Sequence, residues 1–302
     1  MKEFLNYYYY ILPDKIHKIN NKYYFQFKNN YFSFIPFYGN INNLNSILSL
    51  NNYMLYQNNK INKIILNKEG SIITKKDNNY YILLLLNTHS KDIINIQNII
   101  YFSNIKTNFL DLNRTNWYLL WSRKVDYLEY LKNNLSKEYN LIYNSLPYFI
   151  GLSENAISYL KYSNLKNNHI SICHTRINCK ESISEFYNPT NLVIDYKVRD
   201  IAEYYKSLFF DLKMDIKEII NSLKKIKMNE IDSIYFYIRM LYPSYYFDLI
   251  DEILNGNLKQ EAILKITKNI NDYEYLLYEI YLYIKSQYNI IGIDWINKKF
   301  AY

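Results

Sequence analysis

The first third of the chain carries short runs of aromatic and aliphatic residues separated by polar turns. Residues 22–37 read KYYFQFKNNYFSFIPF, which is typical of a β-hairpin broken at Asn29 and Asn30. Residues 41–57 instead place their Leu, Ile and Met side chains at helical spacing. Three further short apolar stretches follow, at residues 61–66, 71–75 and 80–86. The pattern therefore predicts a hairpin, a helix and three short strands.

From residue 91 onward the strand pattern nearly vanishes and helical spacing replaces it. Residues 116–135 predict a long amphipathic helix, with Trp117 and Trp121 on its apolar side. Residues 152–162 predict another helix, with Ser153 as a candidate N-cap. Further helices are predicted at residues 200–212, 214–226, 230–241, 246–254 and 271–288.

This order of elements predicts an α+β protein with two lobes. We expect a small β-rich N-terminal lobe at residues 1–87 and a large helical C-terminal lobe at residues 88–302. A chain of 302 residues is long enough to bury a sizeable core.

The composition is unusual in Tyr and Gly, with 37 Tyr and only five Gly, beside many Asn, Lys and Ile residues. AT-rich codons favour Tyr, Asn, Lys and Ile, so we interpret this bias as a property of the genome. The formal net charge is +8, but Lys is dispersed without a long basic block, and only five residues are Arg. Dispersed charge of this kind is usually a solvated surface, which argues against a nucleic-acid partner.

Membrane and disulfide signals are weak. The N-terminal segment has an acidic residue at Glu3, Pro13 soon after and no small-residue cleavage site, so we expect no signal peptide. The strongest apolar run, residues 80–86, is too short to cross a bilayer. Cys173 and Cys179 lack the second pair that a zinc site needs, and we interpret them as structural thiols. We therefore expect cytoplasmic synthesis and no membrane anchor.

Residues 171–210 contain the most informative pattern. Asp200 lies directly before an apolar helical repeat with Glu203 three positions on, which resembles a capping box. Before it, residues 192–194 predict a buried strand that ends in Asp195. A carboxylate in this position is placed to hold a metal ion or to pair with a cation.

A known family shares this arrangement. A His loop, an apolar strand ending in Asp and an Arg-Asp helix start resemble the core of aminoglycoside phosphotransferase-like kinases. The YutH-type spore coat kinase-like proteins are more similar still, on an Ile-Cys-His-x-Arg turn and an Asp followed four residues later by Arg-Asp-x-Ala-Glu. The matching residues here are Ile172, Cys173, His174, Arg176, Asp195, Arg199, Asp200, Ala202 and Glu203.

Three other segments agree with this family, so the resemblance runs from about residue 40 to the C-terminus. They contain Tyr148, Gly151, Glu154, Asn155 and Ala156; Trp121, Lys124, Asp126 and Tyr127; and residues 241–252. The resemblance implies the two-lobed protein-kinase-like fold.

The resemblance also allows each part of kinase chemistry to be tested. A phosphate cradle normally needs glycines, and no Gly-rich loop occurs in the first lobe. Lys28 is the nearest candidate for the nucleotide Lys, but the helix at 41–57 has no Glu or Asp to pair with it. Arg176 stands where kinases place the general base, and Arg cannot accept a proton at ordinary pH. Glu181 takes the position of a Mg²⁺-binding Asn, although Asn178 fits equally well.

Glu185 is a further alternative to Glu181. Asp195 matches the metal-binding Asp of the fold, but a nearby Arg176 or Arg199 offers it an ion pair instead. The kinase pattern implies a structural role for His174. We expect Asp200 to cap its helix and hold the His174 loop, with Arg199, Asp200 and Glu203 as structural residues.

The resemblance thus predicts a spore coat protein with a degenerate kinase-like centre. We expect a pseudokinase, hence not an enzyme, with a structural or assembly role, other spore coat proteins as partners and no cofactor. The alternative is an active small-molecule phosphotransferase that uses ATP and Mg²⁺, with Asp195 and Glu181 as metal ligands.

Overall fold

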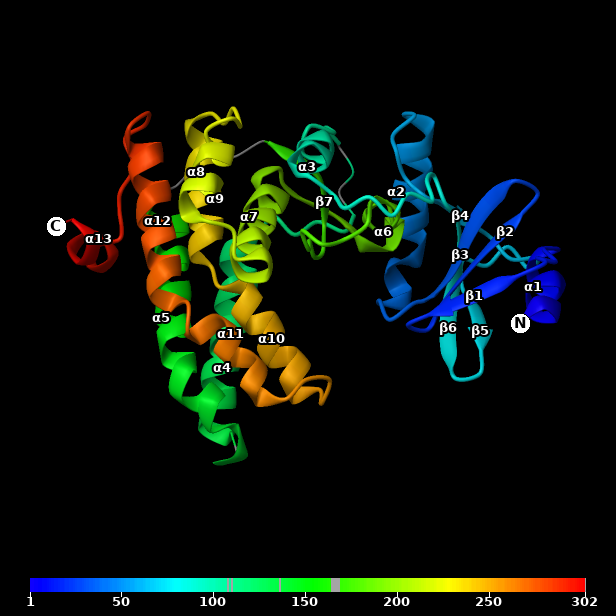
Figure 1. Ribbon diagram of the computed structural model, residues 1–302, viewed down its shortest axis with the longest axis horizontal. Coiled ribbons are helices and arrows are strands. Elements are labelled where there is room, and N and C mark those ends of the chain that lie inside the picture. Colours follow the sequence, from blue (N-terminus) through cyan, green and yellow to red (C-terminus); the bar gives the residue numbers. More distant parts are fainter. Residues whose placement is uncertain (108, 110, 136, 164–168, 302) are drawn as a thin grey trace. The chain divides into compact units, whose positions relative to one another are not determined.

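The computed structural model describes residues 1–107, 109, 111–135, 137–163 and 169–301. The chain folds as two compact units, whose elements are labelled in Figure 1. The first comprises Met1–Asn95, Asn108–Leu112 and Lys180–Ile194. The second comprises Ile96–Thr107, Asn113–Cys179 and Asp195–Tyr302. The units alternate along the sequence, and the boundary expected after residue 87 stays a prediction.

The first unit contains an antiparallel sheet in the order β1-β2-β3-β6-β4, with β5 paired to β6. Its strands are β1 (Ile16–Ile19), β2 (Lys22–Phe27), β3 (Asn30–Pro36), β4 (Lys63–Ile65), β5 (Thr74–Lys76) and β6 (Asn79–Leu85). The predicted hairpin corresponds to β2 and β3, and the three predicted later strands correspond to β4, β5 and β6. The predicted helix corresponds to α2 (Leu44–Tyr56).

Two-residue turns join the first three strands. Asn20 and Asn21 join β1 to β2, and Lys28 and Asn29 join β2 to β3, all four with positive φ. Two-residue hairpin turns match the twist of the strands best when both residues are left-handed, and Asn tolerates that conformation well. The Asn-rich breaks in the sequence therefore set these turns.

Both faces of the sheet are covered, because successive residues of β3 and β6 point to opposite sides. On one face the helix α1 (Lys2–Tyr9) contributes to a buried cluster of Leu5, Tyr9, Ile11, Phe25, Phe32, Phe34, Tyr81 and Leu83. On the other face α2 contributes to a cluster of Ile35, Phe37, Leu44, Ile47, Ile64, Ile72, Ile82 and Leu84. The pattern did not predict α1, whose run of four Tyr residues has no clear period.

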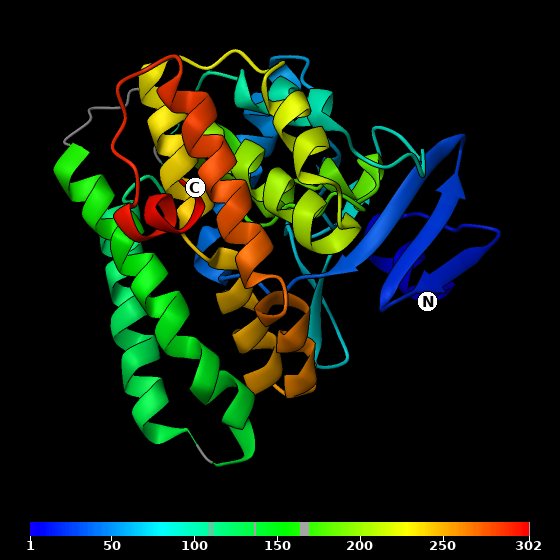
Figure 2. The same cartoon turned by 60° about the vertical axis from the view of Figure 1, so that its left-hand side comes forward.

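The second unit is mainly helical. Its helices are α3 (Ile96–Ser103), α4 (Trp117–Asn134), α5 (Asn140–Ser163), α7 (Val198–Leu212), α8 (Ile216–Leu223), α9 (Glu230–Leu241), α10 (Ser244–Leu254), α11 (Leu264–Thr267), α12 (Ile270–Lys285) and α13 (Asp294–Phe300). The long helices α4 and α5 pack side by side (Figure 2). At the centre, α7 packs against α3 and α9, and both α7 and α9 are buried along most of their length.

A short sheet precedes the central helix α7. It is formed by β7 (Ile170–His174) and β8 (Leu192–Tyr196). The predicted strand at residues 192–194 is therefore the start of β8. The segment between the two strands contains α6 (Ile183–Phe186), which belongs to the first unit.

Two expected helix starts are wrong. The helix predicted at 152–162 begins at Asn140 as α5 and continues through Pro147. Ser153 is therefore not an N-cap, and its hydroxyl donates to the Phe149 carbonyl one turn earlier. Asp200 is not an N-cap either, because α7 begins at Val198 and Lys197 precedes it without a side-chain cap.

None of the helices in the described part of the chain has the length and apolar content that crossing a membrane requires.

Candidate functional site

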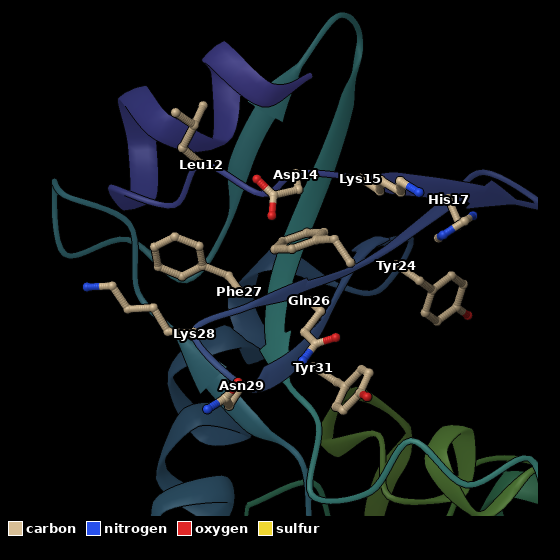
Figure 3. A pocket seen from close by; sticks show the side chains of 11 residues that line it. Leu12, Asp14, Lys15, His17, Tyr24, Gln26, Phe27, Lys28, Asn29 and Tyr31 are labelled. Carbon is tan, nitrogen blue, oxygen red and sulfur yellow. The ribbon is translucent and has the colours of Figure 1, made fainter.

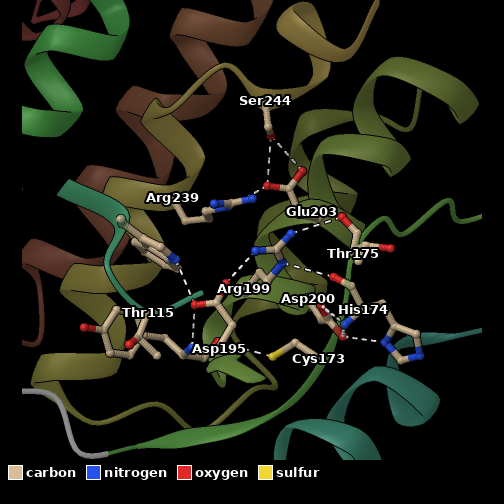
Figure 4. Close-up of polar contacts among 12 residues, drawn as sticks. Thr115, Cys173, His174, Thr175, Asp195, Arg199, Asp200, Glu203, Arg239 and Ser244 are labelled. Atoms are coloured by element: carbon tan, nitrogen blue, oxygen red, sulfur yellow. Dashed lines mark hydrogen bonds and ion pairs between the residues drawn. The ribbon is translucent and has the colours of Figure 1, made fainter. Parts of the chain in front are cut away.

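The strand β8 and the helix α7 deliver the polar residues that the sequence singled out. The strand β8 begins with three buried apolar residues, at positions 192–194, and Asp195 follows them. Arg199, Asp200 and Glu203 follow within the first two turns of α7. All of these side chains lie in the second unit, and Figure 4 shows how they contact one another.

Asp200 fixes the loop that follows β7. Its carboxylate accepts hydrogen bonds from the His174 backbone N–H at 3.0 Å and contacts His174 Nδ1 at 2.7 Å. Both side chains are almost fully buried. The expected contact between Asp200 and the His174 loop is therefore present, although Asp200 makes it from inside the helix and not as a cap.

Both carboxylate oxygens of Asp195 have protein partners. Oδ1 accepts from the Trp117 indole N–H and from the Tyr196 backbone N–H, each at 2.8 Å. Oδ2 accepts from Arg199 Nη1 at 2.5 Å, and the Asp195 side chain is 0% exposed. Burial raises the pKa of Asp195, while the charges of Arg199 and Arg239 oppose that rise.

Arg199 has several partners besides Asp195. Its Nε donates to the His174 carbonyl at 3.1 Å and its Nη2 donates to the Thr175 carbonyl at 3.0 Å. Burial alone would lower the pKa of Arg199, but the carboxylates around it raise the pKa instead. Of the two cations expected beside Asp195, it is Arg199 that forms the ion pair, and it also fixes the loop after β7.

Glu203 is the centre of a second buried ion-pair cluster. Its carboxylate pairs with Lys206 at 3.0 Å and with Arg239 at 2.7 Å, and it accepts from the Ser244 hydroxyl. Burial opposes ionisation of Glu203, but the positive charges of Lys206 and Arg239 lower its pKa below the usual range. The guanidinium of Arg239 also lies over the Trp117 ring, 5.2 Å from its centroid, so the two clusters adjoin.

Arg176 lies at the surface and not against Asp195. Its side chain is 63% exposed, and its Nη2 pairs with Asp248 at 2.5 Å. Its Nη1 donates to the Thr175 carbonyl at 2.8 Å, the same oxygen that accepts from Arg199. The position that the kinase pattern assigns to a general base thus holds a solvent-exposed cation.

The candidate metal ligands divide between the units. Glu181 belongs to the first unit and Asp195 to the second, so a site that joins them stays a prediction. Glu185, an alternative ligand, pairs with Lys22 at 2.5 Å and accepts from the Tyr24 hydroxyl at 2.6 Å. Within the described residues, no group of three or more His, Cys, Asp or Glu side chains is arranged to hold a metal ion.

Lys28, the candidate nucleotide Lys, does not lie on a strand. It occupies the two-residue turn between β2 and β3 with Asn29, and both residues have positive φ. The strand before helix α2, β3, contains no Lys, and α2 contains no acidic residue.

Two open cavities lie on the strands β1 to β3 of the first unit. One, of about 740 Å³, is bordered by the segment that leads into β1 and by the turn after β2, with Asp14, Tyr24 and Lys28 in its wall (Figure 3). The other, of about 790 Å³, extends to His89 and Glu185. Tyr24 and Tyr31 line both.

The family model described as "Spore coat putative kinase YutH" matches residues 2–280. The chain belongs to the YutH family. A curated relative is the endospore coat-associated protein YutH of Bacillus subtilis (strain 168), 26% identical over 155 residues. That match covers 45% of this chain and 45% of the relative, so it spans less than half of either protein.

Solved kinases share the fold of this YutH-family chain. An aminoglycoside phosphotransferase from Alicyclobacillus acidocaldarius superimposes with a TM-score of 0.64 at 8% identity, over 91% of this chain and 93% of that one. The AMP-bound spectinomycin phosphotransferase superimposes with a TM-score of 0.57 at 12% identity, over 93% and 96%. These comparisons confirm the predicted kinase-like α+β fold and the family resemblance.

Several residues of this YutH-family site escaped the sequence reasoning. Trp117 was assigned only to an apolar face, yet its indole N–H bonds Asp195. Lys206 and Ser244 carried no motif. Lys206 meets Glu203 one turn further along α7, and Ser244 meets it because α7 and the start of α10 approach one another. Arg239 offered one usable signal, since it is one of only five Arg residues in a Lys-rich chain.

Proposed function

We propose that this YutH-family chain is a spore coat component with a structural or assembly role, and that its kinase-like fold does not transfer phosphoryl groups. The observation that carries the proposal is the environment of Asp195. Arg199 and Trp117 engage its two carboxylate oxygens, and the side chain is 0% exposed.

The guanidinium of Arg199 supplies what a metal ion would supply at Asp195, a positive charge directly against the carboxylate. To reach Asp195, Mg²⁺ would have to displace Arg199, which also donates to two loop carbonyls. Removing one partner of a buried ion pair costs about 3–5 kcal/mol, because the other charge is left uncompensated. The residues present therefore do not fit a Mg²⁺ ion at this position.

Activation of an acceptor hydroxyl meets a second obstacle at Arg176. A general base must accept a proton, whereas an Arg side chain stays protonated at any ordinary pH. Arg176 can pair with an anion but cannot remove a proton. Together with the lack of a Gly-rich loop, this supports a protein without kinase activity.

We place the protein at the spore coat after synthesis in the cytoplasm, with other coat proteins as its partners. The support is the family to which the chain belongs and the description of the Bacillus subtilis relative as endospore coat-associated.

Thermal denaturation in the presence of ATP tests the proposal. A ligand that binds only the folded protein raises the melting temperature according to its concentration and affinity. We expect millimolar ATP to cause no rise that depends on Mg²⁺ or Mn²⁺. A saturable, metal-dependent rise that disappears in Asp195→Ala would contradict the proposal.

The second candidate function is an active small-molecule phosphotransferase with ATP and Mg²⁺ held by Asp195 and Glu181. The cavity of about 790 Å³ in the first unit favours it, because it has the volume of a small-molecule site and combines aromatic with polar walls. Single-turnover ATP hydrolysis by the wild type and Glu181→Gln distinguishes the two functions. Hydrolysis that Glu181→Gln abolishes would establish the second.

A further inference from the structure

The strand β1 (Ile16–Ile19) forms an open edge of the sheet in the first unit. The sheet order begins with β1, and within the described part of the chain no strand pairs with its far side. At the other end of the order β4 is covered, because its Ile64 donates a backbone N–H to Asn51 of α2. An open edge presents unpaired backbone N–H and C=O groups, which can pair with another extended segment.

The hairpin of β1 and β2 determines which backbone groups face outward. Its two-residue turn makes Ile19 and Lys22 the pair that closes the hairpin with mutual hydrogen bonds. Hydrogen-bonded and non-hydrogen-bonded pairs alternate in an antiparallel ladder, so Ile16 and Lys18 direct their N–H and C=O groups away from β2. On that side neither residue has a backbone partner among the residues that the structure describes. Two residues of β1 are therefore available for pairing.

The side chains along this edge are mostly basic. Lys15, His17 and Lys18 are exposed, and none of the three has an ion-pair partner within the described ranges. Asp14 is the one carboxylate between positions 12 and 19, and the whole chain carries a formal net charge of +8. Lys residues on an edge strand oppose pairing with an identical strand, because the two copies repel one another. The same charges attract an acidic strand.

Both cavities of the first unit adjoin this edge. The cavity of about 790 Å³ is lined by all four residues of β1 and extends to His89 and Glu185. The cavity of about 740 Å³ is bordered by His17 and by the segment that leads into β1 (Figure 3). A strand beside β1 would send alternate side chains to the two faces of the sheet. In strand addition the main-chain hydrogen bonds give affinity, and cavities of this kind accept side chains.

We propose that β1 binds an extended acidic segment of a partner protein, which adds to the sheet as a further strand. Its backbone pairs with Ile16 and Lys18, and its carboxylates lie beside Lys15 and Lys18. The inference rests on the assembly role proposed above, since it names a surface and a partner chemistry for that role. It involves neither Asp195 nor ATP, so the peptide titration below can fail while the ATP titration succeeds.

Isothermal titration of the full chain with the peptide acetyl-Glu-Val-Glu-Val-Glu-amide at low salt tests this edge. We expect binding that weakens as salt is added, and no binding of acetyl-Lys-Val-Lys-Val-Lys-amide. Lys15→Glu and Lys18→Glu should each weaken binding of the acidic peptide about tenfold or more, because they place like charges side by side. Both residues are exposed, so both variants should fold, and Lys15 lies outside the strand.

The matched control is Lys75→Glu. Lys75 is exposed on β5, which β2, β3 and β6 separate from β1 in the same sheet. This variant should bind the acidic peptide like the wild type. Equal weakening in Lys75→Glu would show that the net charge of the chain is responsible, and it would overturn the proposal.

An ester analogue of the acidic peptide separates strand addition from charge attraction. Esters in place of the internal amides keep the charges and side chains but remove the N–H donors, so we expect binding to be lost. Equal affinity for the peptide and its ester analogue would overturn the proposal, as would absence of peptide binding by the wild type. A second copy of the chain is the competing occupant. A wild-type dimer in sedimentation that the acidic peptide does not dissociate would assign the edge to that copy and overturn the proposal as well.

Discussion

A buried carboxylate such as that of Asp195 can bind a metal ion or pair with a cation, and the residues around it decide between these two roles. Its position at the end of a buried strand was predictable from the order of apolar residues and the family motif. Its partner was not, because the sequence placed both Arg176 and Arg199 nearby. The i, i+4 relation across the start of α7 brings Arg199 onto Asp195, whereas Arg176 extends toward Asp248.

Lys206 gives a residue-level prediction on pH dependence. Burial lowers its pKa to about 8, from an ordinary value of 10.5, although Glu203 opposes this shift. Between these values the unfolded chain retains a proton that the folded protein has released, so the free energy of unfolding rises with pH. We expect urea unfolding to show this rise from pH 8 toward pH 10.

The variant Lys206→Met is the matched control, since it keeps most of the side-chain length but cannot titrate. Its unfolding free energy should lack the rise over the same range. An identical pH profile in the wild type and Lys206→Met would show that another group is responsible.

At the scale of secondary structure, a buried Asn joins helix α2 to strand β4. Asn51 donates to the Asn62 carbonyl at 2.7 Å and accepts from the Ile64 backbone N–H at 3.0 Å. Asn51→Leu leaves both backbone groups without this partner, which we expect to cost about 2–4 kcal/mol of unfolding free energy. Chemical denaturation measures this loss directly.

The neighbouring position provides the control for this helix. Asn52 is exposed on α2, and Asn52→Leu should change the unfolding free energy by no more than about 0.5 kcal/mol. Equal effects of the two substitutions would contradict the role assigned to Asn51, because both introduce the same residue into the same helix.

Among the helices and strands, some could be predicted from the sequence and others could not. Alternating apolar residues and Asn-rich turns identified β2, β3 and β6, because these strands form local hairpins or fill a core. Helix α1 was missed, since its Tyr run fits several periods equally well. The start of α5 was misplaced because Ser153 was interpreted as a candidate N-cap, whereas the helix begins at Asn140, continues through Pro147 and packs against α4.

The polar site shows a related limit. Residues within one motif, such as His174 and Asp200, could be matched to a family pattern. Contacts among Trp117, Arg239 and Ser244 depend on which helices meet in space, and no local pattern encodes that. For Arg239, the scarcity of Arg was a signal that the sequence alone provided.

For the molecule as a whole, the buried tyrosines predict sensitivity to alkali. Burial raises the pKa of Tyr9, Tyr159 and Tyr205 to about 12, from an ordinary value of 10.0. Above pH 10 the unfolded chain releases these protons first, so each residue lowers the unfolding free energy by about 1.4 kcal/mol per pH unit. Three such residues remove about 4 kcal/mol by about pH 11, a large part of a typical stability.

We therefore expect unfolding between pH 10 and about pH 12, followed by circular dichroism together with tyrosinate absorbance. The exposed tyrosines should ionise before the helical signal is lost, and the buried ones should ionise with it. A helical signal that persists after all tyrosines have ionised would contradict the assigned burial.

We propose that Asp195 stabilises the fold as the ion-pair partner of Arg199 and does not bind a metal ion. The unfolding free energy of Asp195→Asn, compared with the wild type in metal-free buffer, tests this most directly. The ion pair predicts a loss of about 3–5 kcal/mol, because Arg199 would remain buried without its counter-charge. Unchanged or increased stability is the behaviour of a residue retained for chemistry at the expense of the fold, and that result would contradict the ion-pair role of Asp195.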